Sequence, residues 1–438
     1  MKNKIFAMFD YLLILVIFSL ITLGIMFIYS SSVNSSGVSV NIEYIKQIIW
    51  AGIGLVIMII LTIYDYRKLE RFSFYLYIIL VGLLVFTLIF GKNVNGARSW
   101  IGGRHFGIQP SEFGKSFFIL FLAKFLKDTN NINSQTKRFF LSILILFVPL
   151  ALILVQPDMG TGSVYIPIFL VMCFMAGIPL RYLIFILSYG VLTIFLTILP
   201  VWNSHIASNP VAAINVLTKM RLLMILIAAT ALIAVLGFVI RRYFHGPSYI
   251  FWISYVFSII TLSLVSSIFL GKFLKDYQIM RLIIFMNPNK DRLGAGWNII
   301  QSKIAIGAGG IWGKGYLNGT QSHYRFLPQQ STDFIFSILS EEFGFIGGLV
   351  VFGLYTIIFV KLLILIKLCS NKFGVYIVSG ILAMFVFHFF INIGMVMGIM
   401  PITGIPLLFL SYGGSSLLNS MTCMGLVMSI SYRRKDLM

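Results

Sequence analysis

Apolar runs long enough to cross a lipid bilayer recur along almost the whole of this chain of 438 residues. A transmembrane helix needs about 20 mostly apolar residues, and only helices or closed barrels satisfy their backbone groups inside a membrane. Hydrophobic residues make up 59% of the chain and charged residues only 11%, whereas about 25% of the residues of a soluble protein are charged. We therefore predict an all-α fold, a polytopic transmembrane helix bundle of about 12 spans.

The first apolar run is expected to be a span and not a cleaved signal. It follows Lys2 and Lys4, and its serine-rich end could pass for a signal-peptidase site. Its apolar core is longer than the roughly 7 to 15 residues of a signal peptide, so we expect an uncut helix. All the runs lie near residues 10–29, 46–64, 73–90, 111–126, 139–155, 161–177, 182–200, 222–240, 249–270, 332–360, 374–397 and 404–430.

Basic residues between the runs predict the orientation of the chain. With the N-terminus inside, nearly every cytoplasmic turn is basic, as the positive-inside rule requires. These residues are Arg67, Lys68, Arg71, Lys124, Lys127, Lys137, Arg138, Arg181, Arg241, Arg242, Lys361, Lys367, Lys372, Arg433, Arg434 and Lys435. We predict a multi-pass protein of the cytoplasmic membrane with both termini in the cytoplasm. Residues 91–110, 156–160 and 271–331 would then lie outside.

The outer segment 271–331 is unusually basic for its side of the membrane. Loops longer than about 60 residues escape the positive-inside rule, so the orientation stands. Its charge suits either a solvated loop beside anionic headgroups or a basic platform for an anionic substrate. The glycine-rich run Ile306–Gly315 favours the platform, because N–H groups in such turns can form anion-binding nests. The charged residues are Lys272, Lys275, Arg281, Lys290, Arg292, Lys303, Lys314 and Arg325, with Asp276 and Asp291.

Cysteine and histidine are too scattered to suggest a metal centre or a disulfide framework. Cys173, Cys369 and Cys423 lie far apart, and the five histidines show no ligand spacing. The net charge of +20 comes without a nucleic-acid motif, so we predict no nucleic-acid partner. An anionic lipid or a lipid-linked phosphate is the expected partner instead.

Asp333 is the first candidate for chemistry, because it stands where the basic segment ends and a long apolar helix begins. It could simply cap that helix. However, Ser337, Ser340 and Glu341 continue a polar stripe along the same helix, and a carboxylate inside a membrane bundle suggests a functional site. For Glu341 and its neighbour Glu342 we expect a structural role or a place in a polar cavity.

A second cluster lies in Asn95–Arg104 and in Gln109–Lys115, at an outer helix entrance. Glu112 and Lys115 are three residues apart and could form only a local ion pair. In the functional alternative, Lys115 and Arg98 bind phosphate while Glu112 orients them.

Two further segments break the apolar pattern with proline and glycine. In Gln156–Gly162 we expect Asp158 to cap a helix after Pro157. In Pro401–Pro406 and Ser411–Gly414 the backbone must be buried or line a cavity, so ligand contact and tight helix packing stay equally open.

Six ordered motifs give the chain a resemblance to the SEDS (shape, elongation, division, sporulation) family of membrane-embedded peptidoglycan polymerases. The segment Trp312–Ser322 is similar to the elongation branch more than to the septal branch, which stays an alternative. The resemblance extends over nearly all of residues 1–438, as a single SEDS-type integral membrane domain. The motifs are Asn95–Trp100, Gln109–Glu112, Gln156–Gly160, Gly294–Gly307, Thr332–Phe336 and Ser411–Gly414.

The resemblance implies a peptidoglycan glycosyltransferase that polymerises lipid II at the outer face of the membrane, for cell elongation and rod shape. It places the essential carboxylate at Asp333, which would accept or orient the proton of a sugar hydroxyl. A single carboxylate fits inversion at the anomeric carbon, because retention needs a second nucleophilic carboxylate nearby. Predicted substrate-binding residues, with cations for the pyrophosphate, are Lys115, Glu112, Arg98, Trp100, Lys303, Lys314 and Gln321.

The resemblance also implies partners, namely a class B penicillin-binding protein, which is a transpeptidase, and other membrane proteins of the elongation complex. A divalent cation could assist with the pyrophosphate, although no carboxylate cluster for a metal is visible in the sequence. Two alternatives to polymerisation remain, a lipid II flippase or a non-catalytic scaffold for wall synthesis. The candidate groups gather at one face, whereas transporters place key groups near the midplane, which favours surface chemistry.

The chain departs from the family pattern in three places. Gln329 and Ser331 stand where the family usually has Glu and His, and Leu408 replaces a frequent proline. The family typically has ten spans, and this chain adds a probable inserted helix pair within 201–270. Because two spans are added, the segment 271–331 before Asp333 stays outside. We hypothesise that the pair provides a docking face for a partner or a lipid.

Overall fold

The structure, a computed structural model, divides into two compact units that are described separately. Unit 1 comprises Met1–Ile178 and Asn298–Met438, and unit 2 comprises Pro179–Trp297. The described residues are 10–34, 37–94, 96–102, 107–131, 134–205, 211–244, 247–273, 276–288, 295–324, 326–327 and 329–433. Of the basic residues predicted for the segment 271–331, Lys275, Lys290, Arg292 and Arg325 lie outside this part of the chain.

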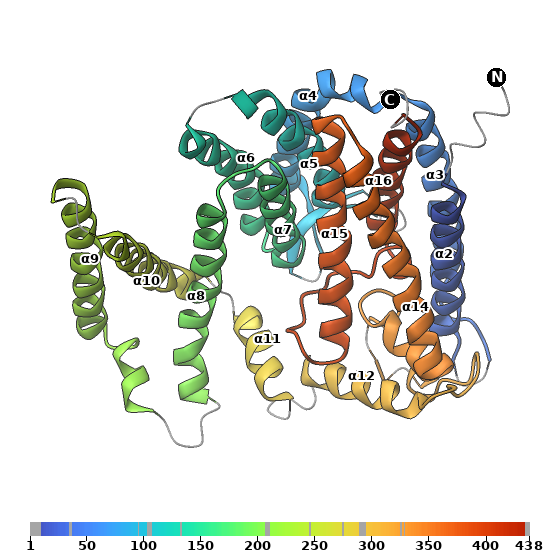
Figure 1. Cartoon of the computed structure of the whole chain (residues 1–438). Coiled ribbons are helices and arrows are strands. Elements are labelled where there is room, and N and C mark those ends of the chain that lie inside the picture. The colour runs from blue at the N-terminus through green and yellow to red at the C-terminus, as the bar shows by residue number, and fades with distance from the viewer. Residues whose placement is uncertain are drawn as a thin grey trace. The chain divides into compact units, whose positions relative to one another are not determined.

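Helices form nearly all of unit 1, and Figure 1 shows α15 running through the middle of their bundle. α15 packs against α5, α7 and α14, while α16 packs against α3 and α5. The helices are α2 (Tyr11–Ser32), α3 (Glu43–Ile63), α4 (Tyr66–Phe90), α5 (Pro110–Asp128), α6 (Gln135–Val155), α7 (Met159–Met175), α12 (Ala295–Gly309, which belongs to unit 1 from Asn298 on), α13 (Thr320–His323), α14 (Ile335–Leu368), α15 (Lys372–Val396) and α16 (Gly414–Arg433), with a short 3-10 helix at Thr129–Asn131.

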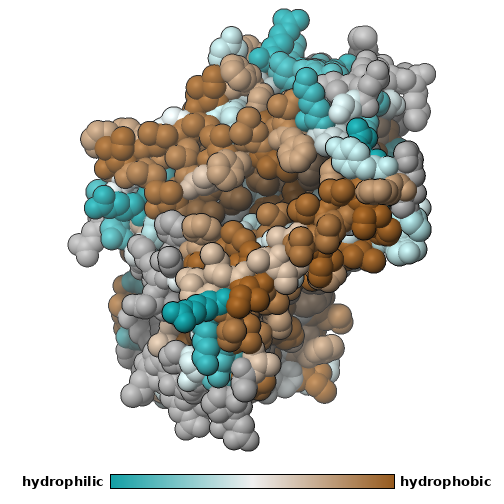
Figure 2. Space-filling view, turned by 90° about the vertical axis from the view of Figure 1, so that its left-hand side faces the viewer, coloured by the Kyte–Doolittle hydropathy of each residue, from teal (hydrophilic) through white to brown (hydrophobic). Residues whose placement is uncertain are grey.

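Unit 2 holds the rest of the helices, including the predicted inserted pair. α9 and α10 pack side by side, and α10 also packs against α8. The elements are α8 (Leu180–His205), a 3-10 helix at Ala212–Val216, α9 (Met220–Tyr243), α10 (Ser248–Phe273) and α11 (Asp276–Met286). Figure 2 views the face that carries α9 and α10, and hydrophobic residues cover most of it.

The predicted helical bundle is confirmed. Among the described residues, nine helices are long and apolar enough to cross a membrane. The three other predicted runs form α5, α7 and α16, of which α7 is too short for that count, at 17 residues. α15 is the most enclosed of the nine, since 72% of its most apolar stretch is buried, against at most 44% in the others. A polar side chain on α15 is therefore placed inside the bundle.

Polar caps explain where several helices begin. A side-chain oxygen at the first turn accepts an otherwise unused backbone N–H. Asp158 accepts the N–H of Thr161 at the start of α7 over 3.2 Å, which confirms the predicted cap. Caps of the same kind start α2, α4, α6 and α15, at Asp10, Asp65, Ser134 and Asn371.

Two predicted segments have more structure than the sequence suggested. The segment 91–110, predicted to lie outside, contains in its described residues a small antiparallel sheet of β1 (Lys92–Val94), β2 (Ala97–Gly102) and β3 (Gly107–Ile108), in the order β1-β2-β3. The segment 271–331, expected as a loop, contains α11, α12 and α13.

The last predicted span is shorter than expected, because its helix α16 begins only at Gly414. Residues 401–413 before it are not helical. Pro401 and Pro406 lack the N–H that a helix would use, and Gly404 has a positive φ of 72°. This irregular segment, residues 401–413, is called the re-entrant segment below.

Candidate active site

Asp333 lies immediately before α14, half-buried, at the end of a turn. Its backbone N–H donates to the carbonyl of Gln329 over 3.2 Å. Phe334 occupies the cap position of α14, and its side chain makes no cap hydrogen bond. Asp333 thus lies one residue before the cap position, and its predicted role as a simple cap stays an alternative. The N-terminal end of a helix favours a negative charge beside it.

Asn392 of α15 joins Asp333 to the re-entrant segment. Its side-chain Nδ2 donates to the backbone carbonyl of Asp333 over 3.0 Å and to that of Ile405 over 2.8 Å. Asn392 is fully buried. On the facing segment, a methyl group placed on Gly404 would lie 3.7 Å from Asp333 Oδ2. One buried amide thus sets the Asp333 carboxylate beside the exposed backbone of Gly404.

His388 of α15 holds the next carbonyl of the re-entrant segment. Its Nδ1 lies 2.9 Å from the carbonyl oxygen of Pro406, which can only accept, so Nδ1 carries the proton. Its Nε2 is then the acceptor for the ammonium of Lys115, at 3.1 Å. His388 and Asn392 are four residues apart and face the same side of α15.

The ion pair of Glu112 and Lys115 lies behind His388. Lys115 Nζ is 2.8 Å from each carboxylate oxygen of Glu112, and the lysine side chain is completely buried. The predicted local ion pair is present, and this lysine supports the re-entrant segment from within the bundle. Contact of Lys115 or Glu112 with a substrate stays a prediction.

The N-terminal end of α3 supports the other side of Asp333. Ser331 donates its hydroxyl to Glu43 Oε2 over 2.6 Å, and its carbonyl accepts the N–H of Tyr412 over 2.8 Å. Gln47 holds Ser411 and Gly413 through its side-chain amide, at 3.3 Å each. α3 therefore links the turn before Asp333 to the end of the re-entrant segment.

Two buried polar atoms near Asp333 have no hydrogen-bond partner among the described residues. They are Asn392 Oδ1 and Thr403 Oγ1. Buried polar atoms of native proteins are almost always hydrogen-bonded, so each such exception calls for an explanation. Ordered water or a polar ligand with hydroxyl groups would satisfy both atoms.

The glycine-rich run before Asp333 packs on α14 and does not form the predicted anion nest. The N–H groups of Gly313, Lys314 and Gly315 donate to the carbonyls of Gly309, Glu341 and Glu342, at 2.8–3.0 Å. A side chain on Gly313, which has a φ of 82°, would overlap the Glu342 carbonyl. The glycines thus let the backbone of this run approach the backbone of α14 closely. These three N–H groups already donate to carbonyls and are not available to an anion.

Lys314 and Gln321 meet at the buried carboxylate of Glu341. Lys314 Nζ lies 2.7 Å from Glu341 Oε1, and the backbone N–H of Gln321 donates to the same carboxylate, at 3.1 Å to Oε1. The N–H of Thr320 donates there as well, over 2.8 Å. Glu341 therefore fastens the start of α13 to α14, as the predicted structural role requires. Substrate binding by Lys314 and Gln321 stays a prediction.

Glu342 of α14 connects α14 to α2 in a similar way, by hydrogen bonds. It accepts the hydroxyl of Ser30 and, at 3.3 Å, the N–H of Leu317. Tyr316, which donates to the carbonyl of Met26 over 3.0 Å, lies close by. Burial, and then the Glu342 carboxylate, raise the pKa of Tyr316 above its usual 10.0, so the phenol keeps its proton as a donor.

Lys303 differs from the other predicted lysines because its side chain is exposed. It projects from α12 beside Gly398, at the C-terminal end of α15. The neighbouring Ser302 bonds to Ser337 over 2.8 Å and to the Val396 carbonyl over 2.6 Å. These bonds place α12 next to the first turn of α14, which follows Asp333.

Arg98 and Trp100 lie on β2 of the small sheet, where Arg98 pairs with Asn93 and Trp100 with Lys92. Arg98 is exposed and Trp100 is half-buried. The sheet leads into α5 through Gln109, whose amide donates to Asp158 over 2.5 Å. The described residues contain no group of three or more His, Cys, Asp or Glu side chains that could hold a metal ion.

Sequence reasoning missed His388, Asn392 and Glu43. His388 and Asn392 carried a usable signal, because two polar side chains four residues apart in an apolar helix mark one face turned inward. Glu43 had none, because its partner Ser331 lies 288 residues away in the sequence.

Comparison with known proteins covers nearly the whole chain. The family model for the cell cycle proteins FtsW, RodA and SpoVE matches residues 10–208 and 201–436. The peptidoglycan glycosyltransferase RodA of Treponema pallidum (strain Nichols) is 49% identical, over 97% of this chain and 98% of that protein. The peptidoglycan glycosyltransferase MrdB of Escherichia coli (strain K12) is 31% identical, over 98% of this chain and 95% of that protein.

A solved structure shares the fold. It belongs to work on the structural coordination of polymerization and crosslinking by a peptidoglycan synthase complex. Its TM-score is 0.68 at 23% identity, covering 97% of this chain and 98% of that chain.

Proposed function

The chain belongs to the FtsW, RodA and SpoVE family of cell cycle proteins and is a peptidoglycan glycosyltransferase of its RodA branch; from this premise we propose that Asp333 is its essential carboxylate. The substrate in this proposal is lipid II, polymerised at the outer face of the membrane during elongation of a rod-shaped cell. The observation that carries the proposal is the position of Asp333, which lies beside Gly404 and one residue before the cap position of α14.

Asp333 acts as the general base in this mechanism. The acceptor hydroxyl oxygen attacks the anomeric carbon of the donor sugar while its proton passes to the Asp333 carboxylate. The bond from the anomeric carbon to the diphosphate oxygen breaks, and the configuration inverts. Glu43, the other carboxylate that reaches this turn, already accepts the Ser331 hydroxyl. This supports inversion over a double displacement, which needs a second carboxylate acting as nucleophile.

Lys303 is the leading candidate to stabilise the leaving diphosphate. Its ammonium is exposed, and α12 fixes its backbone beside the first turn of α14. Arg98 is also exposed and can bind phosphate through two parallel hydrogen bonds. Lys115 and Lys314 instead neutralise the carboxylates of Glu112 and Glu341. We therefore assign these two lysines to the support of the site and Lys303 to charge stabilisation.

The chain is a multi-pass membrane protein, and we propose that Asp333 lies on the extracytoplasmic side with both termini inside. Lys361, near the other end of α14 from Asp333, pairs with Asp10 at the start of α2 over 3.0 Å. At the end of α16, Arg433 donates to the carbonyls of Thr62 and Ile63. Basic groups therefore gather at helix ends away from Asp333, as the positive-inside rule predicts for the cytoplasmic side.

We propose that the enzyme works together with a class B penicillin-binding protein, which crosslinks the new strands. The support is the shared fold with a peptidoglycan synthase complex that coordinates polymerization and crosslinking. We further propose that α9 and α10 are an insertion relative to the ten-span family pattern. The support is that these helices fall in the separate unit 2.

The test of the catalytic proposal is lipid II polymerisation by the purified, reconstituted chain. Loss of a general base lowers a rate by about 10²- to 10⁴-fold, so Asp333→Asn should give almost no polymer. The matched control is Asp65→Asn, which changes the same side chain at the cap of α4. Asparagine caps a helix about as well as aspartate, so the control should retain full activity.

Equal polymer yield from the native chain and Asp333→Asn, with both proteins monodisperse, would remove Asp333 from catalysis. Movement of labelled lipid II across the vesicle bilayer without any polymer would favour the flippase alternative.

A further inference from the structure

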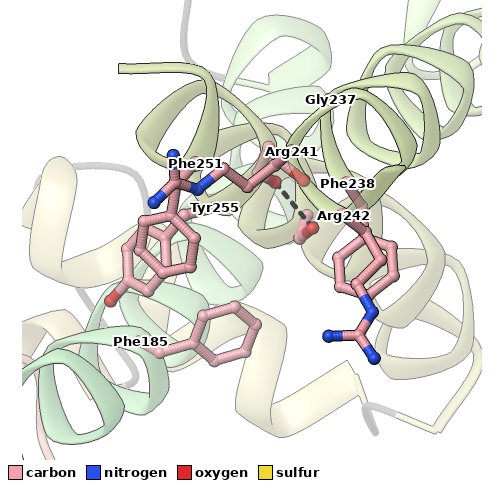
Figure 3. Close-up of a pocket in the computed structure, with 9 residues that line it drawn as sticks. Phe185, Gly237, Phe238, Arg241, Arg242, Phe251 and Tyr255 are labelled. Atoms are coloured by element: carbon pink, nitrogen blue, oxygen red, sulfur yellow. Dashed lines mark hydrogen bonds between the residues drawn. The ribbon is translucent and has the colours of Figure 1, made fainter. Parts of the chain in front are cut away.

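A pocket of about 540 Å³ opens in unit 2 between α8, α9 and α10. Figure 3 shows the guanidinium groups of Arg241 and Arg242 at different sides of it, with the ring of Phe185 facing the space between them. The lining residues are Phe185, Gly237, Phe238, Arg241, Arg242, Phe251, Ser254, Tyr255 and Ser258. We name it the arginine pocket.

Three helices fix the walls of the arginine pocket. α9 and α10 cross closely at Gly237, where a methyl group would lie 3.0 Å from Ser254 Cβ. Beside this crossing, the Ser254 hydroxyl donates to the Ala234 carbonyl over 2.7 Å. The Tyr255 hydroxyl donates to the carbonyl of Arg181 at the start of α8, over 2.6 Å. The pocket is therefore built by packing and does not depend on a ligand to form.

The charge around the arginine pocket favours an anionic ligand. None of its nine described lining residues is acidic. The segment 179–297 that forms unit 2 contains ten lysines and arginines, two aspartates and no glutamate. Arginine binds phosphate through two parallel hydrogen bonds, and its weakly hydrated guanidinium suits a site beside aromatic rings.

The apolar surroundings of the pocket favour a ligand with a hydrocarbon part. Phe238 is 65% exposed, and Trp252, which packs on Phe251 and Tyr255, is 55% exposed. Tryptophan is typical of the interface between the headgroups and the hydrocarbon of a membrane. Figure 2 shows that the face of α9 and α10 is largely hydrophobic. A free phosphate or an acidic peptide would leave this surface unused.

We propose that the arginine pocket binds an anionic phospholipid of the surrounding bilayer. The headgroup phosphate contacts Arg241 and Arg242, and the acyl chains lie along the exposed apolar surface of α9. Basic pockets between transmembrane helices at the cytoplasmic surface bind anionic headgroups in this way. In the alternative, the two arginines only stabilise α9, because positive charges interact favourably with the dipole at a helix C-terminus. That role would need neither the cavity nor its aromatic wall.

The test is native mass spectrometry of the full chain in a neutral detergent. Phosphatidylglycerol and phosphatidylcholine with identical acyl chains are titrated separately. The affected variant is Arg241→Gln with Arg242→Gln, and the control is Arg221→Gln in the first turn of the same helix, also exposed. A cation at the surface contributes about a five-fold gain in affinity for anionic lipid, so loss of both arginines should weaken phosphatidylglycerol binding about 25-fold. Arg221 lies at the other end of α9 and does not line the pocket, so the control should stay within about two-fold of the native chain.

Two outcomes would overturn the proposal. One is equal binding of phosphatidylglycerol by the double variant and by Arg221→Gln, with both eluting as monodisperse proteins. The other is protection of the native chain from thermal unfolding by inorganic phosphate to the same extent as by phosphatidylglycerol, which would identify a free anion as the ligand. Restored binding in Arg241→Lys with Arg242→Lys would support an electrostatic headgroup contact. These outcomes are independent of polymerase activity, so they do not depend on the role of Asp333.

Discussion

Replacing Asn392 with leucine should separate the positioning of Asp333 from its chemistry. The leucine has a similar size but cannot donate to the carbonyls of Asp333 and Ile405, which Asn392 holds at 3.0 and 2.8 Å. Leaving a buried carbonyl without a donor costs about 1–3 kcal/mol, so two of them lower the free energy of unfolding by about 2–6 kcal/mol. A shift of about 1 Å in a catalytic group can slow a reaction about 100-fold.

We therefore expect Asn392→Leu to lower the maximal rate of lipid II polymerisation by about 10- to 100-fold. The KM for lipid II should change little, because in this proposal Asn392 holds the backbone and does not bind substrate. The assay is the initial rate of polymer formation over a range of lipid II concentrations, well below the melting temperature of the variant. Thermal denaturation in detergent reports the stability separately.

The control for this prediction is Ser379→Ala in the same buried helix. The Ser379 hydroxyl donates only within α15, to the carbonyl of Tyr376 over 2.8 Å. Its loss should cost about 1 kcal/mol of stability and leave the rate unchanged. A folded Asn392→Leu protein that polymerises as fast as Ser379→Ala would refute the positioning argument.

Three further predictions test the support around the site. Lys115→Met should lower stability by about 3–5 kcal/mol, because the Glu112 charge stays buried alone; adding Glu112→Gln should recover part of the melting temperature, and no recovery would contradict the pairing. Gly313→Ala should cost about 1–3 kcal/mol at its positive φ, whereas Gly307→Ala, with open space around it, should be neutral or stabilising in the same melting assay. Lys303→Gln should slow polymerisation by about 10²- to 10³-fold if its charge stabilises the diphosphate, and an unchanged rate would reassign that role.

The sequence predicted the features of this protein that depend on local patterns. Apolar runs placed all the long helices of the described chain, and proline before Asp158 marked the start of α7. The ion pair of Glu112 and Lys115 could also be predicted, because the two residues are three apart on one helix. The position of Asp333 at the start of α14 followed from the change in composition.

The contacts between distant segments could not be predicted in the same way. His388 meets Lys115 across 273 residues of sequence, and no local pattern connects them. The glycine-rich run was interpreted as an anion nest, because glycine turns present N–H groups to whatever approaches. The structure brings the carbonyls of Glu341 and Glu342 to that place. Tertiary packing decides which group meets these N–H groups, and the glycine content of the run does not reveal it.

α15 holds the re-entrant segment at two main-chain oxygens, those of Ile405 and Pro406, and its Phe385 ring packs against Phe409. The two hydrogen bonds to carbonyls do not depend on the side chains of residues 405 and 406, provided that the backbone path is kept. The side chains around Gly404 can therefore be exchanged by design to alter which acceptor sugar is accepted. The choice of acceptor sugar could then be changed without lowering the stability of the helix bundle.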